Sequence, residues 1–216
     1  MTMITAHSGS DGTPENSLEF VRFFSNKPIE AIEVDVRYDS ETRQLILRHD
    51  EIRGQADTLL SDVFVFMQGT DLLLNCDLKE PGLEMRIKKL AEEYHLWAQI
   101  LLSGTVDVYY LSKWPDHILM NIENGLEQVL SWNQWTEQTV LDAANYLVAR
   151  GATRLNLPYQ CYTEPLIAFA QKHHIGLSLW TVNELQALSY LEEQNVYNVT
   201  TRNAWKYFQV RQEVVQ

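Results

Sequence analysis

Short apolar runs alternate with segments of helical period along the chain. Eight of the runs predict strands, at Met3–Ala6, Ala31–Val36, Asp71–Leu78, Gln99–Ser103, His117–Ile122, Arg154–Leu157, Gly176–Val182 and Asn195–Thr200. Between them, apolar residues spaced for one helix face predict helices, at Glu15–Phe24, Leu59–Met67, Leu83–His95, Val106–Trp114, Gly125–Leu130, Thr136–Arg150, Thr163–His173, Glu184–Glu193 and Ala204–Val214.

This alternation predicts an α/β fold. Because a helical segment follows each of the eight strands and no linker or composition break interrupts them, we expect a single (β/α)8 TIM barrel domain over residues 1–216. A doubly wound open sheet is the alternative. The sequence lacks the glycine-rich dinucleotide fingerprint of many such sheets, which disfavours it.

A second strand-like run, Gln44–Asp50, follows the second predicted strand closely. Only eight residues, 37–44, separate Val36 from Leu45. A parallel crossover needs about a dozen residues or more, so we expect the two runs to pair antiparallel, as a hairpin arm after the second strand. Folding the chain near Ser40 places His49 roughly opposite Glu33.

Two acidic residues alternate with apolar residues in the second predicted strand. Glu33 and Asp35 therefore share one face of that strand. Neighbouring carboxylates repel each other unless a cation or a shared proton lies between them, and such hard oxygen ligands suit Mg²⁺ or Ca²⁺. A histidine beside a carboxylate-bound cation is typical of a hydrolytic site.

Composition narrows the class of protein. The 216 residues carry a formal charge of −12, which disfavours nucleic acid and anionic membrane as partners. No apolar run reaches the roughly 20 residues that span a bilayer, and no signal peptide is visible in MTMITAHSG. Cys76 and Cys161 suggest reduced thiols rather than a disulfide framework. We therefore expect a cytoplasmic protein.

The ends of the first three predicted strands concentrate ionisable residues. In a barrel of this type the chemistry lies at the carboxyl ends of the strands. The first three ends, with the hairpin arm, carry His7, Glu33, Asp35, His49, Asp77 and Lys79. Ordinary strand ends carry about one polar residue each, so this concentration marks the candidate site.

Five motifs in order resemble one known family. AHSG with PENS, then IEVDV, LILRHD, NCDLK and LWTVN, between Thr5 and about Thr201, are similar to the motifs of the glycerophosphodiester phosphodiesterases. These are metal-dependent barrel enzymes. By residue, the resemblance implies an acid–base pair (His7 and His49), metal ligands (Glu33, Asp35 and Asp77), a phosphate-binding lysine (Lys79) and an aromatic residue lining the substrate pocket (Trp180).

The resemblance implies a hydrolase of lipid metabolism that uses Mg²⁺ or Ca²⁺. It would cleave a small-molecule glycerophosphodiester into glycerol phosphate and an alcohol. The sequence departs from the family pattern at Ser8, where arginine is usual, and at Asp77, where glutamate is usual. Only 26 residues, 51–76, follow His49-Asp50 where the family has an insertion, which looks reduced.

These departures leave two alternatives open. One is a catalytically impaired barrel that binds a metal or phosphate ligand. The other is a phospholipase-like enzyme that forms a cyclic phosphate. The sequence does not indicate the oligomeric state.

Overall fold

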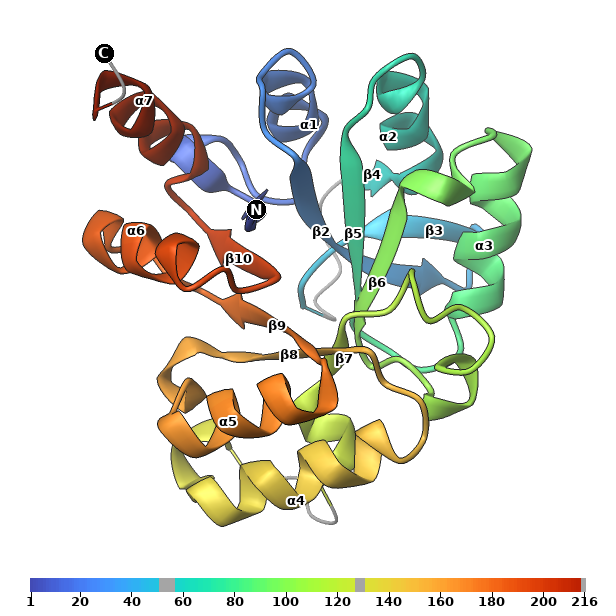
Figure 1. The fold of residues 1–216 in the computed structure, drawn as a ribbon. Coiled ribbons are helices and arrows are strands. Elements are labelled where there is room, and N and C mark those ends of the chain that lie inside the picture. The colour runs from blue at the N-terminus through green and yellow to red at the C-terminus, as the bar shows by residue number, and fades with distance from the viewer. Residues whose placement is uncertain (51–56, 127–130, 215–216) are drawn as a thin grey trace.

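Eight parallel strands form a curled sheet in the described part of the chain, which is residues 1–50, 57–126 and 131–214 of a computed structural model (Figure 1). The strands are β1 (Met3–Ala6), β2 (Ala31–Asp39), β5 (Leu73–Leu78), β6 (Ile100–Gly104), β7 (Met120–Asn121), β8 (Arg154–Pro158), β9 (Gly176–Trp180) and β10 (Asn198–Thr201). They correspond one to one with the eight predicted strands.

The strands follow one another around the sheet in the order β6–β5–β2–β1–β10–β9–β8–β7. The two ends of this order meet, because Leu102 of β6 forms a parallel bridge with Ile118, just before β7. Two backbone hydrogen bonds strengthen the junction, from Leu102 N to His117 O (2.7 Å) and from Leu119 N to Leu102 O (2.9 Å). This arrangement is that of a TIM barrel.

Helices cover the outside of the sheet (Figure 1). They are α1 (Leu18–Phe24), α2 (Leu60–Met67), α3 (Glu84–Glu93), α4 (Glu137–Val148), α5 (Glu164–His173), α6 (Leu185–Glu193) and α7 (Ala204–Val214). Each lies within a segment predicted to be helical. In the described residues, no helix combines the length and the apolar character needed to cross a bilayer.

One predicted helix does not form, and another lies largely outside the described residues. The prediction of a helix at Val106–Trp114 is wrong: the structure has only a 3₁₀ turn, Val108–Tyr110, begun by Asp107, whose side chain accepts from Tyr109 N (2.9 Å). Pro115 comes directly after the predicted segment, and a proline disfavours helical geometry in the residue before it. Of the other segment, Gly125–Leu130, residues 127–130 lie outside the described residues; a 3₁₀ turn, Ile122–Gly125, precedes them.

The short strand β3 (Gln44–Leu47) pairs antiparallel with the second half of β2, from Val36 opposite Leu47 to Asp39 opposite Gln44. A two-residue strand, β4 (Thr58–Leu59), pairs with β3 in turn. Residues 51–56, where the reduced insertion was predicted to begin, lie outside the described residues.

The chain after β3 stays beside β2. Arg48 N continues the antiparallel register beyond Leu47 by donating to Asp35 O (3.0 Å), and His49 O accepts from Arg37 Nε (3.1 Å). Arg48 also pairs with Asp57. His49 and Glu33 line one cavity, as expected from the hairpin.

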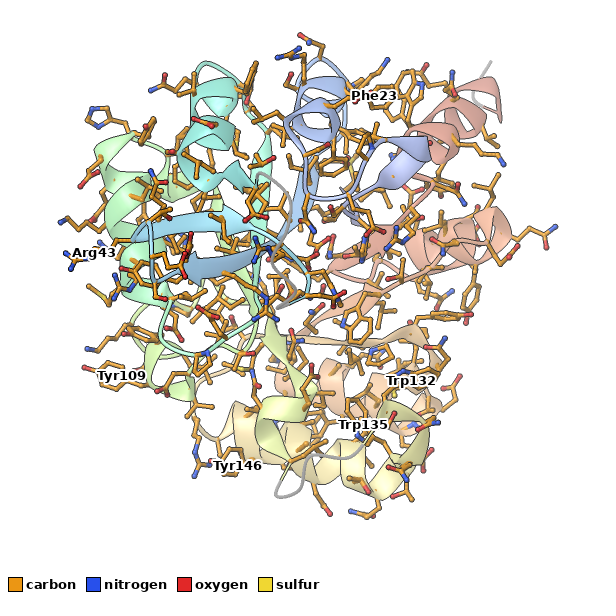
Figure 2. All side chains as sticks on the ribbon, turned by 180° about the vertical axis from the view of Figure 1, so that it is seen from behind. Phe23, Arg43, Tyr109, Trp132, Trp135 and Tyr146 are labelled. Atoms are coloured by element: carbon orange, nitrogen blue, oxygen red, sulfur yellow. The ribbon has the colours of Figure 1, made fainter. Side chains whose placement is uncertain are left out.

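The two faces of the sheet carry different cores. The face toward the helices is apolar, with Ile32 of β2 and Leu74 of β5 fully buried. The helices bury large side chains in the same core, namely Phe20 and Phe24 of α1 and Phe64 of α2. Figure 2 shows from behind the side chains that project outward, including the exposed Tyr109 and Trp132. Burial of the apolar face stabilises the barrel.

The inner face carries a polar belt. Thr5 Oγ1 donates to Asn198 Oδ1 (2.7 Å), Asn198 Nδ2 to Ser178 Oγ (2.9 Å), Ser178 Oγ to Asn156 Oδ1 (2.8 Å) and Asn156 Nδ2 to Asn121 Oδ1 (2.8 Å). These five residues come from five neighbouring strands and are buried. Because each is hydrogen-bonded, the belt is a polar interior without a large desolvation penalty.

Candidate active site

A cavity of about 420 Å³ opens at the carboxyl ends of the strands. The structure brings all seven residues singled out in the sequence to its lining: His7, Glu33, Asp35, His49, Asp77, Lys79 and Trp180. Four of them lie on β2, β5 and β9, and the other three directly follow or come shortly after β1, β3 and β5. The concentration of ionisable residues that the sequence predicted at these strand ends is therefore a single site in space.

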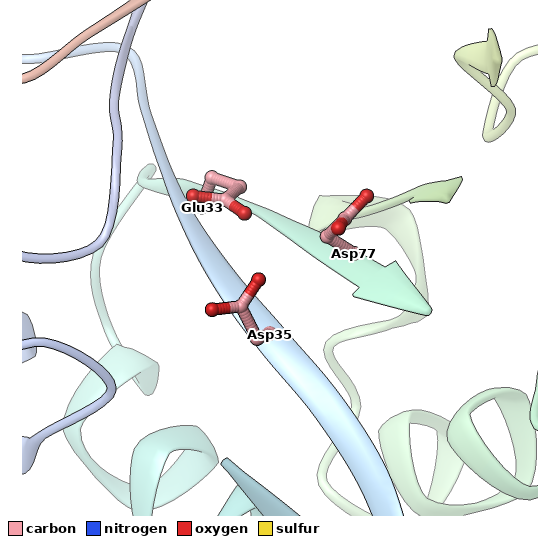
Figure 3. Close-up of side chains that lie close together, drawn as sticks. All are labelled: Glu33, Asp35 and Asp77. Atoms are coloured by element: carbon pink, nitrogen blue, oxygen red, sulfur yellow. The ribbon is translucent and has the colours of Figure 1, made fainter. Parts of the chain in front are cut away.

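Three carboxylates meet in this cavity (Figure 3). Glu33 and Asp35 alternate on β2, and the parallel register places Asp35 beside Asp77 of β5. Each residue offers one oxygen, and these oxygens lie within 4.8 Å of one another. Hard oxygen donors at this spacing fit Mg²⁺ or Ca²⁺.

The electrostatics of Glu33 support the same conclusion. Its carboxyl is buried, and burial raises the pKa of Glu33 well above its ordinary value. The charges of Asp35 and Asp77 raise the pKa further. A bound cation or proton uptake by Glu33 relieves this repulsion. The residues present therefore fit a divalent cation.

Lys79 already neutralises part of this charge. Its Nζ lies 2.8 Å from Asp35 Oδ1 and 2.5 Å from Asp77 Oδ2. Burial would lower the pKa of Lys79, but the two carboxylates outweigh it and raise the pKa. Burial would likewise raise the pKa of Asp35, but Lys79 and the hydrogen bonds of Asn16 hold it below its ordinary value.

Asn16 is a site residue that the sequence analysis did not single out. Its Nδ2 donates to Asp35 Oδ2 (2.7 Å), and its Oδ1 accepts from Asp35 N (2.9 Å). Asn16 has a left-handed backbone (φ 50°), which asparagine tolerates better than most residues. It does not cap α1; Ser17 does, accepting from Phe20 N. Asn16 lies in the PENS motif, just before a helix start, where a capping role was the simpler interpretation.

Hydrogen bonds also orient the other two carboxylates. Ser8 N donates to Glu33 Oε2 (3.1 Å), and Ser103 Oγ donates to Asp77 Oδ1 (2.7 Å). Ser103 in turn accepts from Asn75 Nδ2 (2.9 Å). Such second partners fix the direction in which a ligand oxygen points, and they tune metal affinity.

Two histidines line the same cavity but differ in environment. His7 is half-buried, and its Nδ1 lies 2.9 Å from Ser8 O and 3.7 Å from Glu33 Oε2. Because a carbonyl oxygen can only accept, Nδ1 carries the proton, and the neutral ring keeps a lone pair on Nε2. Burial lowers the pKa of His7, and the charge of Arg202 adds to the effect.

His49 is more open. Its side chain is 62% exposed, and its Nδ1 lies 2.8 Å from Asp50 Oδ1. This carboxylate orients the imidazole and leaves Nε2 as the ring nitrogen that can exchange a proton in the cavity.

Trp180 and Glu123 complete the far wall of the cavity. Trp180 ends β9, and its Nε1 is buried with no hydrogen-bond partner among the described residues. Glu123, which the sequence analysis left unassigned, accepts from Asn121 Nδ2 (2.8 Å) at the end of the polar belt. This wall therefore offers the Glu123 carboxyl as an acceptor, together with the side chain of Trp180.

Comparison of the sequence with protein-family models and with curated proteins gives no match. Solved structures do match. A candidate glycerophosphoryl diester phosphodiesterase from Agrobacterium tumefaciens has a TM-score of 0.79 at 14% identity, covering 99% of this chain and 98% of its own. A glycerophosphodiester phosphodiesterase from Parabacteroides distasonis has a TM-score of 0.74 at 14% identity, covering 100% and 98%.

The chain has the glycerophosphodiester phosphodiesterase fold. An Oleispira antarctica phosphodiesterase, solved with its product sn-glycerol-3-phosphate, has a TM-score of 0.70 at 16% identity, covering 97% of this chain and 96% of its own. At this identity the likeness concerns the fold. The comparisons confirm the predicted barrel fold, which this chain shares with these phosphodiesterases, and the roles of the individual site residues stay predictions.

Proposed function

We propose that this protein is a metal-dependent phosphodiester hydrolase that converts glycerophosphodiesters to glycerol phosphate and an alcohol. One observation carries the proposal. The three carboxylates whose oxygens lie within 4.8 Å of one another share a cavity with two histidines, on a phosphodiesterase fold. A carboxylate cage suits a cation, and two imidazoles suit proton transfer in both directions.

Glu33, Asp35 and Asp77 would hold Mg²⁺ or Ca²⁺. A cation bound there supplies several kcal/mol of stabilisation to the charge that develops on the phosphoryl oxygens, acting as a Lewis acid. Ser8 N–H, Asn16 and Ser103 keep the three carboxylates in place.

The histidines would move the protons. His7 Nε2 would accept a proton from the attacking water, because its Nδ1 is occupied by Ser8 O. As the new oxygen–phosphorus bond forms and the bond to the leaving alcohol breaks, His49 protonates the leaving oxygen. Each general acid–base step contributes roughly 10²–10⁴-fold.

Two further residues would bind the substrate. The ammonium of Lys79 reaches a phosphoryl oxygen as a point charge while it stays close to Asp77. Trp180 would line the part of the cavity that takes the alcohol.

The test is a panel of glycerophosphodiesters assayed with and without chelator. Replacing His49 with alanine is expected to abolish metal-dependent release of glycerol phosphate. His173→Ala is the control, because His173 is exposed and lies on α5, outside the cavity lining. Turnover retained by His49→Ala would reject the assignment of this histidine.

One observation favours the catalytically impaired alternative. Lys79 Nζ already lies between Asp35 and Asp77, where a cation would be expected. Tight binding of Mg²⁺ or Ca²⁺ with no turnover of any diester would support that alternative. Phosphorus NMR of the products separates hydrolysis from formation of a cyclic phosphate, in which a substrate hydroxyl attacks.

A further inference from the structure

The cavity is short of positive charge for an anionic substrate. Its lining carries five carboxylates: Glu15, Glu33, Asp35, Asp77 and Glu123. Among the described residues that line it, the fixed cations are Lys79 and Arg202. Lys79 is bonded to two of the carboxylates. A phosphodiester bound here therefore needs a further cationic contact, and the sequence analysis did not consider Arg202.

The fold places Arg202 next to the first histidine. β10 pairs with β1 so that Thr201 lies opposite Ala6, and His7 N donates to Thr201 O (2.8 Å). Arg202 follows directly. Its guanidinium lies over the turn after β1: Nη1 is 3.3 Å from the point that a Cβ at Gly9 would occupy. The guanidinium is thus on the same side of the cavity as the His7 imidazole.

The backbone of Arg202 is anchored, whereas its side chain keeps free donors. Arg202 N donates to Asn183 Oδ1 (3.0 Å), and Arg202 O accepts from Asp11 N (2.8 Å). Nη1 donates to Glu15 Oε1 (2.5 Å). Nε and Nη2 form no hydrogen bond with any residue in the described ranges, and the side chain is 41% exposed. Two donors therefore remain for a ligand.

The side chains of the turn after β1 do not fill the space that the Arg202 guanidinium occupies. Ser8 is buried, and its Oγ accepts from Asn16 N (2.6 Å), so its side chain is occupied within the protein. Gly9 has φ 79°, and a Cβ there would lie 2.6 Å from Glu15 Cγ. A side chain at position 9 would displace the pair formed by Glu15 and Arg202.

We propose that Arg202 is a substrate-binding residue, which donates from Nε and Nη2 to the phosphoryl oxygens. This rests on the function proposed above. The phosphoryl group would lie between the guanidinium on the β1–β10 side and the carboxylate cage on β2 and β5. A guanidinium suits this role because its planar donors match two oxygens at once.

The test is calorimetric binding of sn-glycerol 3-phosphate to the Mg²⁺-saturated protein, alongside the diester assay. Arg202→Gln is expected to weaken binding by about 10- to 100-fold, the range for a lost hydrogen bond to a charged group. Arg202→Lys keeps the charge but not the planar fork and is expected to recover part of the affinity. Mg²⁺ affinity measured without phosphate is expected to stay within about twofold.

Arg211→Gln is the matched control. It removes the same charge from another ion-paired arginine, whose Nη2 lies 3.0 Å from Glu192 Oε1, outside the cavity lining. Its binding of glycerol phosphate is expected to be unchanged. An equal loss in this control would mean that only net charge matters, and the role of Arg202 would be refuted.

The outcomes separate this inference from the proposed function. If the wild-type protein hydrolyses diesters but Arg202→Gln and Arg202→Lys bind glycerol phosphate as tightly as it does, Arg202 has no such role and the proposed function stands. If the wild-type protein binds glycerol phosphate without hydrolysing any diester, the proposed function fails and the variants still decide the role of Arg202. No binding by the wild-type protein overturns the inference.

Discussion

Replacing Asn16 with aspartate changes one hydrogen-bond donor of the site into an acceptor. The amide Nδ2 of Asn16 now donates to Asp35 Oδ2, while Oδ1 accepts from Asp35 N. In Asn16→Asp the second bond is kept, and the first is replaced by contact between two carboxyl oxygens. The shape of the side chain is almost unchanged, so the effect is electrostatic.

The size of that effect follows from two competing costs. At the 2.7 Å that separates Asn16 Nδ2 from Asp35 Oδ2, two charges would repel by about 6 kcal/mol at an effective dielectric constant of about 20. Protonating a carboxyl of ordinary pKa near 4 costs about 1.4 kcal/mol per pH unit, hence about 4 kcal/mol at pH 7. Proton uptake is cheaper, so the folded variant binds a proton between the two carboxyls.

The sign of the pH dependence follows from linkage. The folded variant holds a proton that the unfolded chain releases, so its pKa is raised in the folded state. Relative to the wild-type protein, stability is retained near pH 4 and lost as the pH rises. We expect the destabilisation to grow by about 1.4 kcal/mol per pH unit, from about 1.4 kcal/mol at pH 5 to about 4 kcal/mol at pH 7.

Urea unfolding followed by tryptophan fluorescence, with chelator at pH 5, 6 and 7, measures these differences. Asn16→Gly removes both hydrogen bonds without backbone strain and is expected to cost about 2–4 kcal/mol with little pH dependence. Asn26→Asp, at an exposed position on the turn after α1, is expected to stay within about 0.5 kcal/mol. A flat pH profile for Asn16→Asp would refute the contact between Asn16 and the Asp35 carboxylate.

Three further expectations concern the carboxylate cage. Saturating chelator-treated protein with Mg²⁺ or Ca²⁺ to about 100 times its Kd should raise the free energy of unfolding by about 2.7 kcal/mol, and Glu33→Gln should remove that gain in a denaturation assay. Ser103→Ala, which strips a hydrogen bond from Asp77, should weaken cation affinity by about 10- to 100-fold in calorimetry. Gly104→Ala should lower the free energy of unfolding more than Gly69→Ala, because its Cβ would lie 2.8 Å from Asp77 Oδ1. A Cβ at Gly69 meets open space, so that variant carries only a backbone penalty of about 1–2 kcal/mol. Equal losses in the two variants would argue against the close packing at position 104.

The sequence predicted strands and helices well in segments where the apolar residues followed a single period. Alternation of acids and apolar residues in Ala31–Val36 predicted that Glu33 and Asp35 share a face, and they do. Helical spacing likewise located the seven α-helices, because burial on one side requires that spacing. One element was predicted wrongly. The helix expected at Val106–Trp114, the segment before Pro115, does not form.

Residues that act through distant contacts were missed. Asn16 lies on a loop and reaches Asp35 on β2 only after the chain folds back. Arg202 comes to the first histidine because β10 pairs with β1. The predicted barrel implies that pairing, but no motif in the sequence marks Arg202 itself. The approach of His49 to the carboxylates could be predicted, because the short loop between β2 and β3 forces antiparallel pairing.

The cavity is built from two strand pairings that differ in how far apart their strands lie in the sequence. The cage belongs to β2 and β5, which are consecutive parallel strands, whereas His7 and Arg202 become neighbours only across a seam between the first and the tenth strand. Long-range pairings form late because closing their loop costs more entropy. A folding intermediate in which β1 and β10 are not yet paired would therefore bind a cation but would not hydrolyse an anionic substrate. Turnover would then show that the barrel has closed.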